Sequence, residues 1–181
     1  KCLETYDARS LKIEEIDPKV SNSFFEKSHL EGSTRNVITF GLVDGMGNVY
    51  ASMSLRKPFH ASKSSRLEVA RSAILPGVSV RGWIGRLTKE SLRYSKHNGY
   101  EGLMTYVDAR VGNGGGYTSS ETWKLEKEST GPRFWWTDFE NRFNRFKYKA
   151  DKINGLSQVE VAMNAGVSEI WGCGNSLLIS V

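Results

Sequence analysis

The segment from Val78 to Leu87 constrains the fold more than any other stretch, because it joins a strand-like run to a helix-like run through a short bend. The bend contains two glycines and two arginines in the order Arg81-Gly82-Trp83-Ile84-Gly85-Arg86. Glycines let backbone N–H groups approach an anion closely, and a helix N-terminus adds free donors and partial positive charge. The bend is therefore either a tight strand-to-helix turn or a place where a phosphate group binds.

The bend does not match the two common phosphate-binding motifs. It lacks the Gly-Lys-Ser/Thr ending of a Walker loop, and it lacks the three glycines of the dinucleotide fingerprint. Any anion bound there belongs to another class of ligand.

Composition indicates one domain. A chain of 181 residues with 39% apolar and 25% charged residues is long enough for one core and short for two. The expected class is a soluble, cytoplasmic protein, because no apolar run approaches the roughly 20 residues of a membrane span. Cys2 and Cys173 lie far apart and show no metal-ligand spacing, so we expect free thiols and no metal site.

Apolar periodicity and turn residues predict a mixed set of elements. The clearest is a hairpin formed by 37–43 and 49–55 around Asp44-Gly45-Met46-Gly47-Asn48. Further strands are expected at 11–16, 66–75, 103–107, 134–137, 170–171 and 177–179. Helices are expected at 21–32, 84–97, 139–146 and 157–164, the last with a capping box between Ser157 and Glu160.

The stretch from Arg133 to Lys152 is both basic and aromatic, in a chain of formal net charge +5. Phe139, Phe143 and Phe146 fall on one face of the predicted helix, while arginines and lysines occupy another. Cations at this spacing can neutralise phosphates, and an exposed Trp136 can stack on a base. An aromatic core under a solvated basic face explains the pattern equally well.

A series of short motifs runs along the chain from about His29 onward. They are 29–32, 53–55 with 57–58, 67–69 with Arg71, 80–87, 106–110, the glycine loop before Tyr117, Arg142 with Arg145, and 173–175. In this order the motifs resemble the phage-encoded branch of the GNAT acyltransferases, which includes Mom-type DNA-modification proteins and a domain accompanying phage homing endonucleases. The bend departs from the usual Gln/Arg-x-x-Gly-x-Gly/Ala loop because its spacing is compressed.

The resemblance implies a single α+β domain over 1–181, with a basic aromatic part at about 132–181. Its mixed sheet would be mostly antiparallel with a central splayed parallel pair, and helices would cover both faces. A phage protein of this kind would work in the host cytoplasm. The implied residues that bind acetyl-CoA or another acyl-CoA are Ile74, Leu75, Val80, Arg81, Gly82, Trp83, Ile84, Gly85 and Arg86.

Two catalytic residues are expected. Tyr117 follows the glycine loop, where this fold often places the acid for a thiolate leaving group, although a packed aromatic at a helix start is equally consistent. Glu68 lies in an apolar strand, so it either deprotonates an amine or forms an ion pair with Arg66 or Arg71. Residues expected to contact substrate or nucleic acid are His29, Arg71, Asp108, Arg110, Trp136, Arg142 and Arg145.

Three functions remain open from the sequence. The first is an acyl-CoA-dependent N-acyltransferase that acts on an amine, including an amine of a nucleobase. The second is a DNA-binding module without catalysis that accompanies a phage endonuclease. The third is a structural virion or assembly protein, since no catalytic triad or metal set is evident. Neither the acceptor nor the oligomeric state follows from the sequence.

Overall fold

A computed structural model describes residues 4–58, 65–128, 134–144 and 146–180. The chain divides into two compact units, of which the first comprises 1–106, 114–126 and 177–181, and the second 107–113 and 127–176. The basic aromatic part expected from about residue 132 lies within the second unit. Arg133 and Arg145, together with Cys2 and His60, lie outside the described residues.

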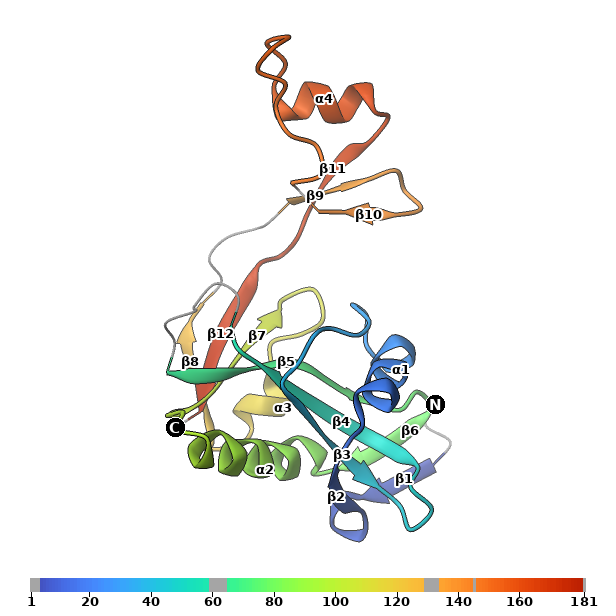
Figure 1. Cartoon of the computed structure of the whole chain (residues 1–181), viewed down its shortest axis with the longest axis vertical. Coiled ribbons are helices and arrows are strands. Elements are labelled where there is room, and N and C mark those ends of the chain that lie inside the picture. The colour runs from blue at the N-terminus through green and yellow to red at the C-terminus, as the bar shows by residue number, and fades with distance from the viewer. Residues whose placement is uncertain (1–3, 59–64, 129–133, 145, 181) are drawn as a thin grey trace. The chain divides into compact units, whose positions relative to one another are not determined.

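The elements follow one another in the order labelled in Figure 1. Those before the second unit are β1 (Glu4–Asp7), η1 (Ala8–Ser10), β2 (Lys12–Glu15), α1 (Pro18–Ser28), β3 (Ile38–Val43), β4 (Val49–Arg56), β5 (Arg66–Ile74), β6 (Val78–Arg81), α2 (Trp83–His97), β7 (Gly102–Asp108), α3 (Gly115–Thr118) and β8 (Trp123–Lys127). The remaining elements are β9 (Phe134–Thr137), β10 (Arg142–Phe143), α4 (Gln158–Asn164), β11 (Ser168–Trp171) and β12 (Asn175–Ser180).

Seven strands form the main sheet, in the order β2-β3-β4-β5-β7-β12-β8. The pairs β2-β3, β3-β4 and β4-β5 are antiparallel, whereas β5 and β7 are parallel. The predicted hairpin is β3-β4, and the Asp44 side chain closes its turn by accepting from the Met46 and Asn48 backbone N–H groups. The expected α+β class, a mostly antiparallel sheet with a central parallel pair, is confirmed.

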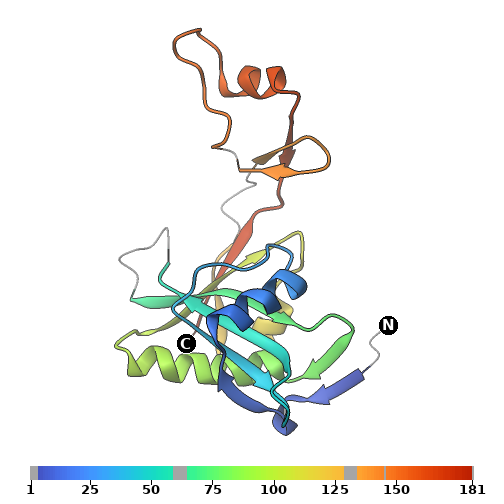
Figure 2. The same ribbon diagram turned by 45° about the vertical axis from the view of Figure 1, so that its right-hand side comes forward.

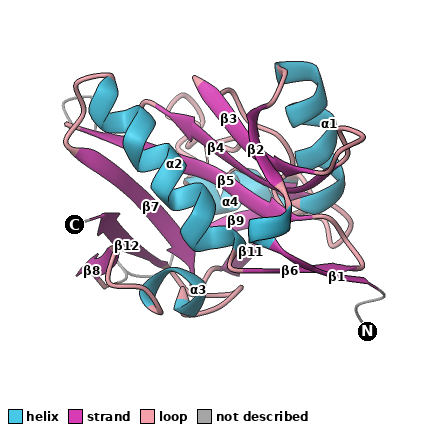
Figure 3. Ribbon diagram, turned by 90° about the horizontal axis from the view of Figure 1, so that it is seen from below, coloured by secondary structure: helices cyan, strands magenta, loops and turns pink. Residues whose placement is uncertain are grey.

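Helices cover both faces of this sheet, as expected. Successive residues of a strand point to opposite faces, and on β3 Thr39 contacts Ser21 of α1 whereas Phe40 packs edge-on against Tyr94 of α2. Figure 3 shows α2 running across the strands. The α2 face holds most of the large buried aliphatic side chains, while Phe24, Phe25 and Ala73 form a core cluster on the α1 face.

The two long helices begin and end where local chemistry requires. Asp17 caps α1 by accepting from the Lys19 backbone N–H, and Pro18 follows at the first helical position. In α2 the buried residues Leu87, Thr88, Ser91 and Ser95 fall on one face, and Ser95 Oγ donates to the Gly102 carbonyl at 2.8 Å. None of the helices in the described ranges is long and apolar enough to cross a membrane.

The second unit has its own small core, built around Trp136, Ala162 and Val167. Strands β10, β9 and β11 form a three-stranded antiparallel sheet, and α4 begins at the predicted capping box. Figure 2 shows these elements in orange to red.

The helix predicted over 139–146 is wrong. Asp138 accepts from the Glu140 and Asn141 backbone N–H groups, which closes a tight turn between β9 and β10 in place of a first helical turn. Phe139 sits in that turn at φ 73° and is 84% exposed, so the three phenylalanines share no buried face. Two strands were also not predicted. They are β1, which pairs in parallel with β6, and β8, whose charged residues obscure the alternation of apolar and polar residues.

Candidate functional site

The parallel pair β5-β7 opens after three residue pairs. Arg66, Leu67 and Glu68 oppose Gly102, Leu103 and Met104, although both strands continue for several residues. At the next position the Thr105 side chain, not a backbone group, donates to the Val69 carbonyl at 3.2 Å. The expected splay of the central parallel pair is therefore present, and it begins at Val69 and Thr105.

A β-bulge explains why the strands diverge at this point. Leu55 of β4 opposes Val69 and Ser54 opposes Arg71, so Ala70 is an extra residue on β5. Bulges bend the strand that contains them and increase its twist. Arg71 Nη1 donates to the Ala70 carbonyl at 2.8 Å, which satisfies a group displaced from the ladder.

Tyr117 lies at the mouth of this opening. Its hydroxyl is 2.6 Å from Ser72 Oγ on β5 and also hydrogen-bonds Thr105 on β7, so it bridges the diverging strands. Its ring packs edge-on against Trp123, with 5.1 Å between centroids. Burial of the hydroxyl raises the pKa of Tyr117, and the bonds to Ser72 and Thr105 act in the opposite direction. At neutral pH the phenol is therefore protonated, as an acid must be.

The N-terminus of α2 is open to a ligand. Gly82 is the N-cap residue at φ 74°, where it has no side chain with which to cap the helix, and the first turn contains no acidic residue. A Cβ built on Gly82 or on Gly85 would meet no atom within 4 Å. The first turn of the helix therefore has no side-chain cap for its backbone N–H groups, an arrangement that favours an anion.

The glycine loop brings Tyr117 to this helix end. Gly116 packs so closely on α2 that a Cβ there would lie 2.6 Å from Ile84 Cδ1. A side chain at this position would require the Ile84 side chain to move, so the loop packs directly on the first turn of α2. The predicted anion loop and the predicted acid thus share one region of the first unit.

The other predicted cofactor residues differ in their surroundings. Val80 is buried, whereas Arg81 is exposed at the end of β6. Arg86 Nη1 donates to the Ala8 and Leu11 carbonyls, the latter at 2.7 Å, and so ties α2 to the N-terminal turn. The Leu75 N–H donates to the Tyr50 carbonyl on β4. Because the backbone groups of successive strand residues point to opposite neighbouring strands, the Ile74 N–H points toward β7, with which β5 no longer pairs at this position.

Glu68 forms an ion pair, but not with the arginines expected. Its Oε1 is 2.5 Å from Arg56 Nη2, and the two residues are directly opposite on β5 and β4. The Glu68 side chain is 7% exposed, so the pair is nearly removed from solvent. Glu68 projects to the α1 face and Tyr117 meets the sheet at Ser72, which opposes Met53 on the α2 face.

Arg71 and His29 shape the loop that follows α1. Arg71 Nε donates to the Gly32 carbonyl at 2.9 Å, and Nη1 lies 3.5 Å from a Glu31 carboxylate oxygen. His29 Nδ1 accepts from the Glu31 N–H at 3.1 Å, so the neutral ring carries its proton on Nε2. Burial lowers the pKa of His29, and the positive charge of Arg71 lowers it further. The ring is a hydrogen-bond donor at neutral pH.

The remaining predicted contact residues lie in the second unit. Asp108 and Arg110 form an ion pair with each other, and the hydrogen bonds from Arg110 hold the pKa of Asp108 below its usual range. The Arg142 guanidinium lies over the Trp135 ring at 4.4 Å. Trp136 is only 1% exposed, so its ring belongs to the core and the stacking interpretation does not fit it. Arg145 lies outside the described residues.

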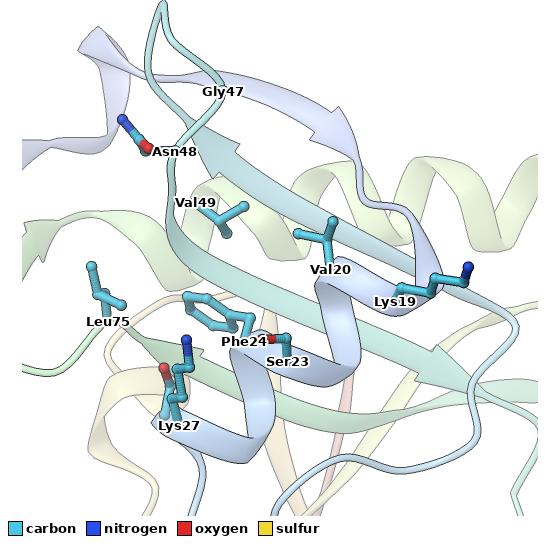
Figure 4. Close-up of a pocket in the computed structure, with 10 residues that line it drawn as sticks. Lys19, Val20, Ser23, Phe24, Lys27, Gly47, Asn48, Val49 and Leu75 are labelled. Atoms are coloured by element: carbon cyan, nitrogen blue, oxygen red, sulfur yellow. The ribbon is translucent and has the colours of Figure 1, made fainter.

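A groove of about 460 Å³ lies between α1 and the turn that joins β3 to β4. In Figure 4, Val20 and Phe24 of α1 line it together with Val49 and Leu75, and Lys19 is among the charged residues at its margin. It lies on the α1 side of the sheet, so it is distinct from the opening that Tyr117 bridges. Among the residues in the described ranges, no cluster of His, Cys, Asp or Glu could hold a metal ion. Cys173 is an exposed free thiol.

Sequence reasoning missed three residues of the site: Arg56, Ser72 and Thr105. The register of the strands and the bulge determine which side chains these three residues meet, and the residue pattern reveals neither. A signal existed for Ser72 alone, because a serine in the apolar run 67–75 requires a partner.

A comparison with protein families finds no match for this sequence, and a comparison with curated proteins finds none either. Among solved structures, the chain is similar to an IAA acetyltransferase from Bacillus cereus at 12% identity, with TM-score 0.49, covering 95% of this chain and 99% of that one. It is similar to the ribosomal-protein-S18-alanine N-acetyltransferase from Escherichia coli at 10% identity, with TM-score 0.48, covering 94% and 92%.

A third similar structure is a GNAT family acetyltransferase from Elizabethkingia anophelis with acetyl-CoA bound. The identity is 12% and the TM-score 0.48, with coverage of 95% of this chain and 97% of that chain. Likenesses at this level say nothing about activity.

Proposed function

We propose that the protein is an acyl-CoA-dependent N-acyltransferase of the GNAT type. One observation carries the proposal: the parallel strands β5 and β7 part after three residue pairs, and Tyr117 bridges them at the point of parting. A thioester placed in this opening would meet a protonated phenol close to its sulfur atom. The resemblance of the sequence to the phage-encoded branch of this fold points to the same reaction class.

The N-terminus of α2 fits the pyrophosphate of an acyl-CoA. Its uncapped N–H groups and the open space over Gly82 and Gly85 supply donors and room. Arg81, which is exposed at the end of β6, supplies positive charge. The Ile74 N–H, on the edge of β5 that β7 has left, is placed to pair with the amide-bearing arm of the same molecule.

The residues then divide the chemistry as follows. The acceptor nitrogen attacks the thioester carbonyl, the C–N bond forms, and the C–S bond breaks as Tyr117 gives its proton to sulfur. The proton lost by the amine passes to solvent or, for an acceptor that enters from the α1 face on which Glu68 lies, to Glu68 through water. Tyr117 regains its proton from solvent before the next turnover. Because Glu68 also pairs with Arg56, its contribution as a base must be separated from its contribution to stability.

Calorimetric titration with acetyl-CoA tests the proposal directly. The wild-type protein should bind, whereas Gly85→Glu should not, because the new carboxylate would occupy the N-terminus of α2. Gly85→Gln is the matched control, since it has the same size without the charge and meets the same open space. If the wild type shows no binding of acetyl-CoA, the proposal is wrong.

The acceptor is an amine, and we propose a nucleobase amine in a phage context as the candidate that the sequence resemblance favours. A second candidate function is DNA binding without catalysis. It is favoured by the second unit, where Trp171 is 59% and Phe146 is 61% exposed and three lysines (Lys147, Lys149 and Lys152) are also exposed. Exposed aromatics with nearby cations are typical of surfaces that stack on bases.

Salt dependence separates this candidate from weak charge attraction. Affinity for single-stranded DNA should fall steeply as salt rises, because phosphate contacts release counterions. Trp171→Ala should weaken binding at every salt concentration without changing the slope, whereas Lys147→Ala should reduce the slope. Binding that is absent at low salt would exclude this function.

A further inference from the structure

We propose that Ser72 and Thr105 are positioning residues that orient the Tyr117 hydroxyl and stabilise it when it has given up its proton. The inference rests on the proposed acyltransferase function, in which Tyr117 is the acid. Neither residue belongs to the anion loop or the acceptor side, and both touch the one hydroxyl that bridges the opening.

Counting protons gives the chain of hydrogen bonds a direction. The Thr105 hydroxyl has one proton, which it donates to the Val69 carbonyl, so its oxygen is left to accept. Tyr117 can donate to that oxygen, and the Ser72 hydroxyl is then free to donate to Tyr117. The order that satisfies every group runs from Ser72 to Tyr117 to Thr105 to the Val69 carbonyl.

This order has a chemical consequence. When Tyr117 turns its proton from Thr105 to the sulfur of the departing thiolate, Ser72 still donates to the phenolate oxygen. A hydrogen bond to the charged form favours that form. Thr105 orients the Tyr117 O–H before the reaction, whereas Ser72 stabilises the negative charge that develops on the Tyr117 oxygen. The two hydroxyls therefore contribute differently to the proton transfer.

Among the residues that the structure describes, no charged group shifts the pKa of Tyr117. Tyr117 meets Ser72 of β5, Thr105 of β7, Trp123 of β8 and the first turn of α2 through Gly116. Within the described residues, burial and the two hydroxyls are the influences on the pKa of Tyr117. Thr105 is itself only 4% exposed, so water does not readily replace its hydroxyl.

The test replaces Tyr117 by difluorotyrosine, whose more acidic phenol titrates below the pH at which proteins unfold, and follows the ring by fluorine NMR. Ser72→Ala should raise the pKa of this phenol, whereas Thr105→Val should not raise it, because Thr105 accepts a hydrogen bond from the neutral form. Ser72→Thr, which retains the hydroxyl, should leave it unchanged. In the protein with tyrosine, Ser72→Ala should lower kcat about tenfold with little change in KM, since about that much follows from one hydrogen bond to a charged group.

The two readouts separate the inference from the proposed function. An unchanged phenol pKa in Ser72→Ala, in a protein that transfers acyl groups normally, would overturn the positioning role alone. A raised pKa in a protein that neither binds nor uses acetyl-CoA would support the hydroxyl chain and refute the acyltransferase. Equal losses of kcat in Ser72→Ala and Ser72→Thr would also overturn the inference, because the hydroxyl would then not be the active group.

Discussion

Replacing Glu68 by Gln should destabilise the first unit, because it leaves the Arg56 guanidinium inside the sheet without its carboxylate. The side chains of Arg56 and Glu68 are 17% and 7% exposed, and their atoms are 2.5 Å apart. Removing one partner of a buried pair costs about 3 to 5 kcal/mol, and the partial exposure of Arg56 favours the lower end. For a domain of 150 to 250 residues a loss of about 3 kcal/mol lowers Tm by about 6 to 12 °C.

A double-mutant cycle isolates the pair. Arg56→Met should cost a similar amount, since the nearly buried Glu68 carboxylate would then lose the cation with which it is paired. The combined Arg56→Met/Glu68→Gln protein should lose less stability than the two single variants together, by about 2 kcal/mol or more. Thermal unfolding followed by circular dichroism measures all four proteins.

Acyl-transfer rates measured well below each Tm complete the experiment. If Glu68 is structural, Glu68→Gln should keep its rate per folded molecule within a few-fold of the wild type. If Glu68 is also the base, that rate should fall by about a hundredfold or more. A Glu68→Gln protein that unfolds at the wild-type temperature, with additive single variants, would refute the reasoning about the buried pair.

Three further predictions concern stability. Phe139→Gly should stabilise the second unit by about 1 kcal/mol, because φ 73° strains any residue with a Cβ; Phe139→Ala should give no such gain in thermal unfolding. Gly116→Ala should cost about 1 kcal/mol or less in denaturant titration, because the Ile84 Cδ1 that the new methyl group meets can move by a change of rotamer, and adding Ile84→Val should remove that cost. Hydrogen bonds from Asn48 hold the pKa of Asp44 at about 2. The ionised Asp44 carboxylate therefore stabilises the folded protein fully above about pH 4, and this stabilisation is lost as pH falls toward 2. The difference in Tm between wild type and Asp44→Asn should shrink over that range.

Local signals predicted much of the fold. Asp44 and the glycines beside it identified the β3-β4 hairpin, and Ser157 with Glu160 located the start of α4. These features depend on residues within a few positions of one another, so their chemistry can be read in order along the chain. The helix predicted around Phe139 failed because the hydrogen bonds that Asp138 accepts can close a turn as well as cap a helix, and Phe139 has a φ of 73°, which a right-handed helix excludes.

The site was predictable only in part. The sequence resemblance singled out Tyr117 and the bend from Arg81 to Arg86, and the structure brings them into one region, but their roles stay predictions. The partners of Glu68 and Tyr117 were not predicted, since they depend on which residues of distant strands face each other. Arg56 pairs with Glu68 because β4 and β5 place them opposite one another, and no spacing along the chain encodes that choice.

The bulge at Ala70 means that the opening between β5 and β7 is specified by the number of residues in a strand and not by their identity. Without Ala70, Val69 and Arg71 would follow each other in an unbroken ladder against Leu55 and Ser54, with no displaced carbonyl for Arg71 to hold. Removing this single residue should let the parallel strands continue side by side and close the space that Tyr117 guards. A one-residue deletion, with every side chain that contacts Tyr117 retained, would therefore convert the opening into continuous sheet.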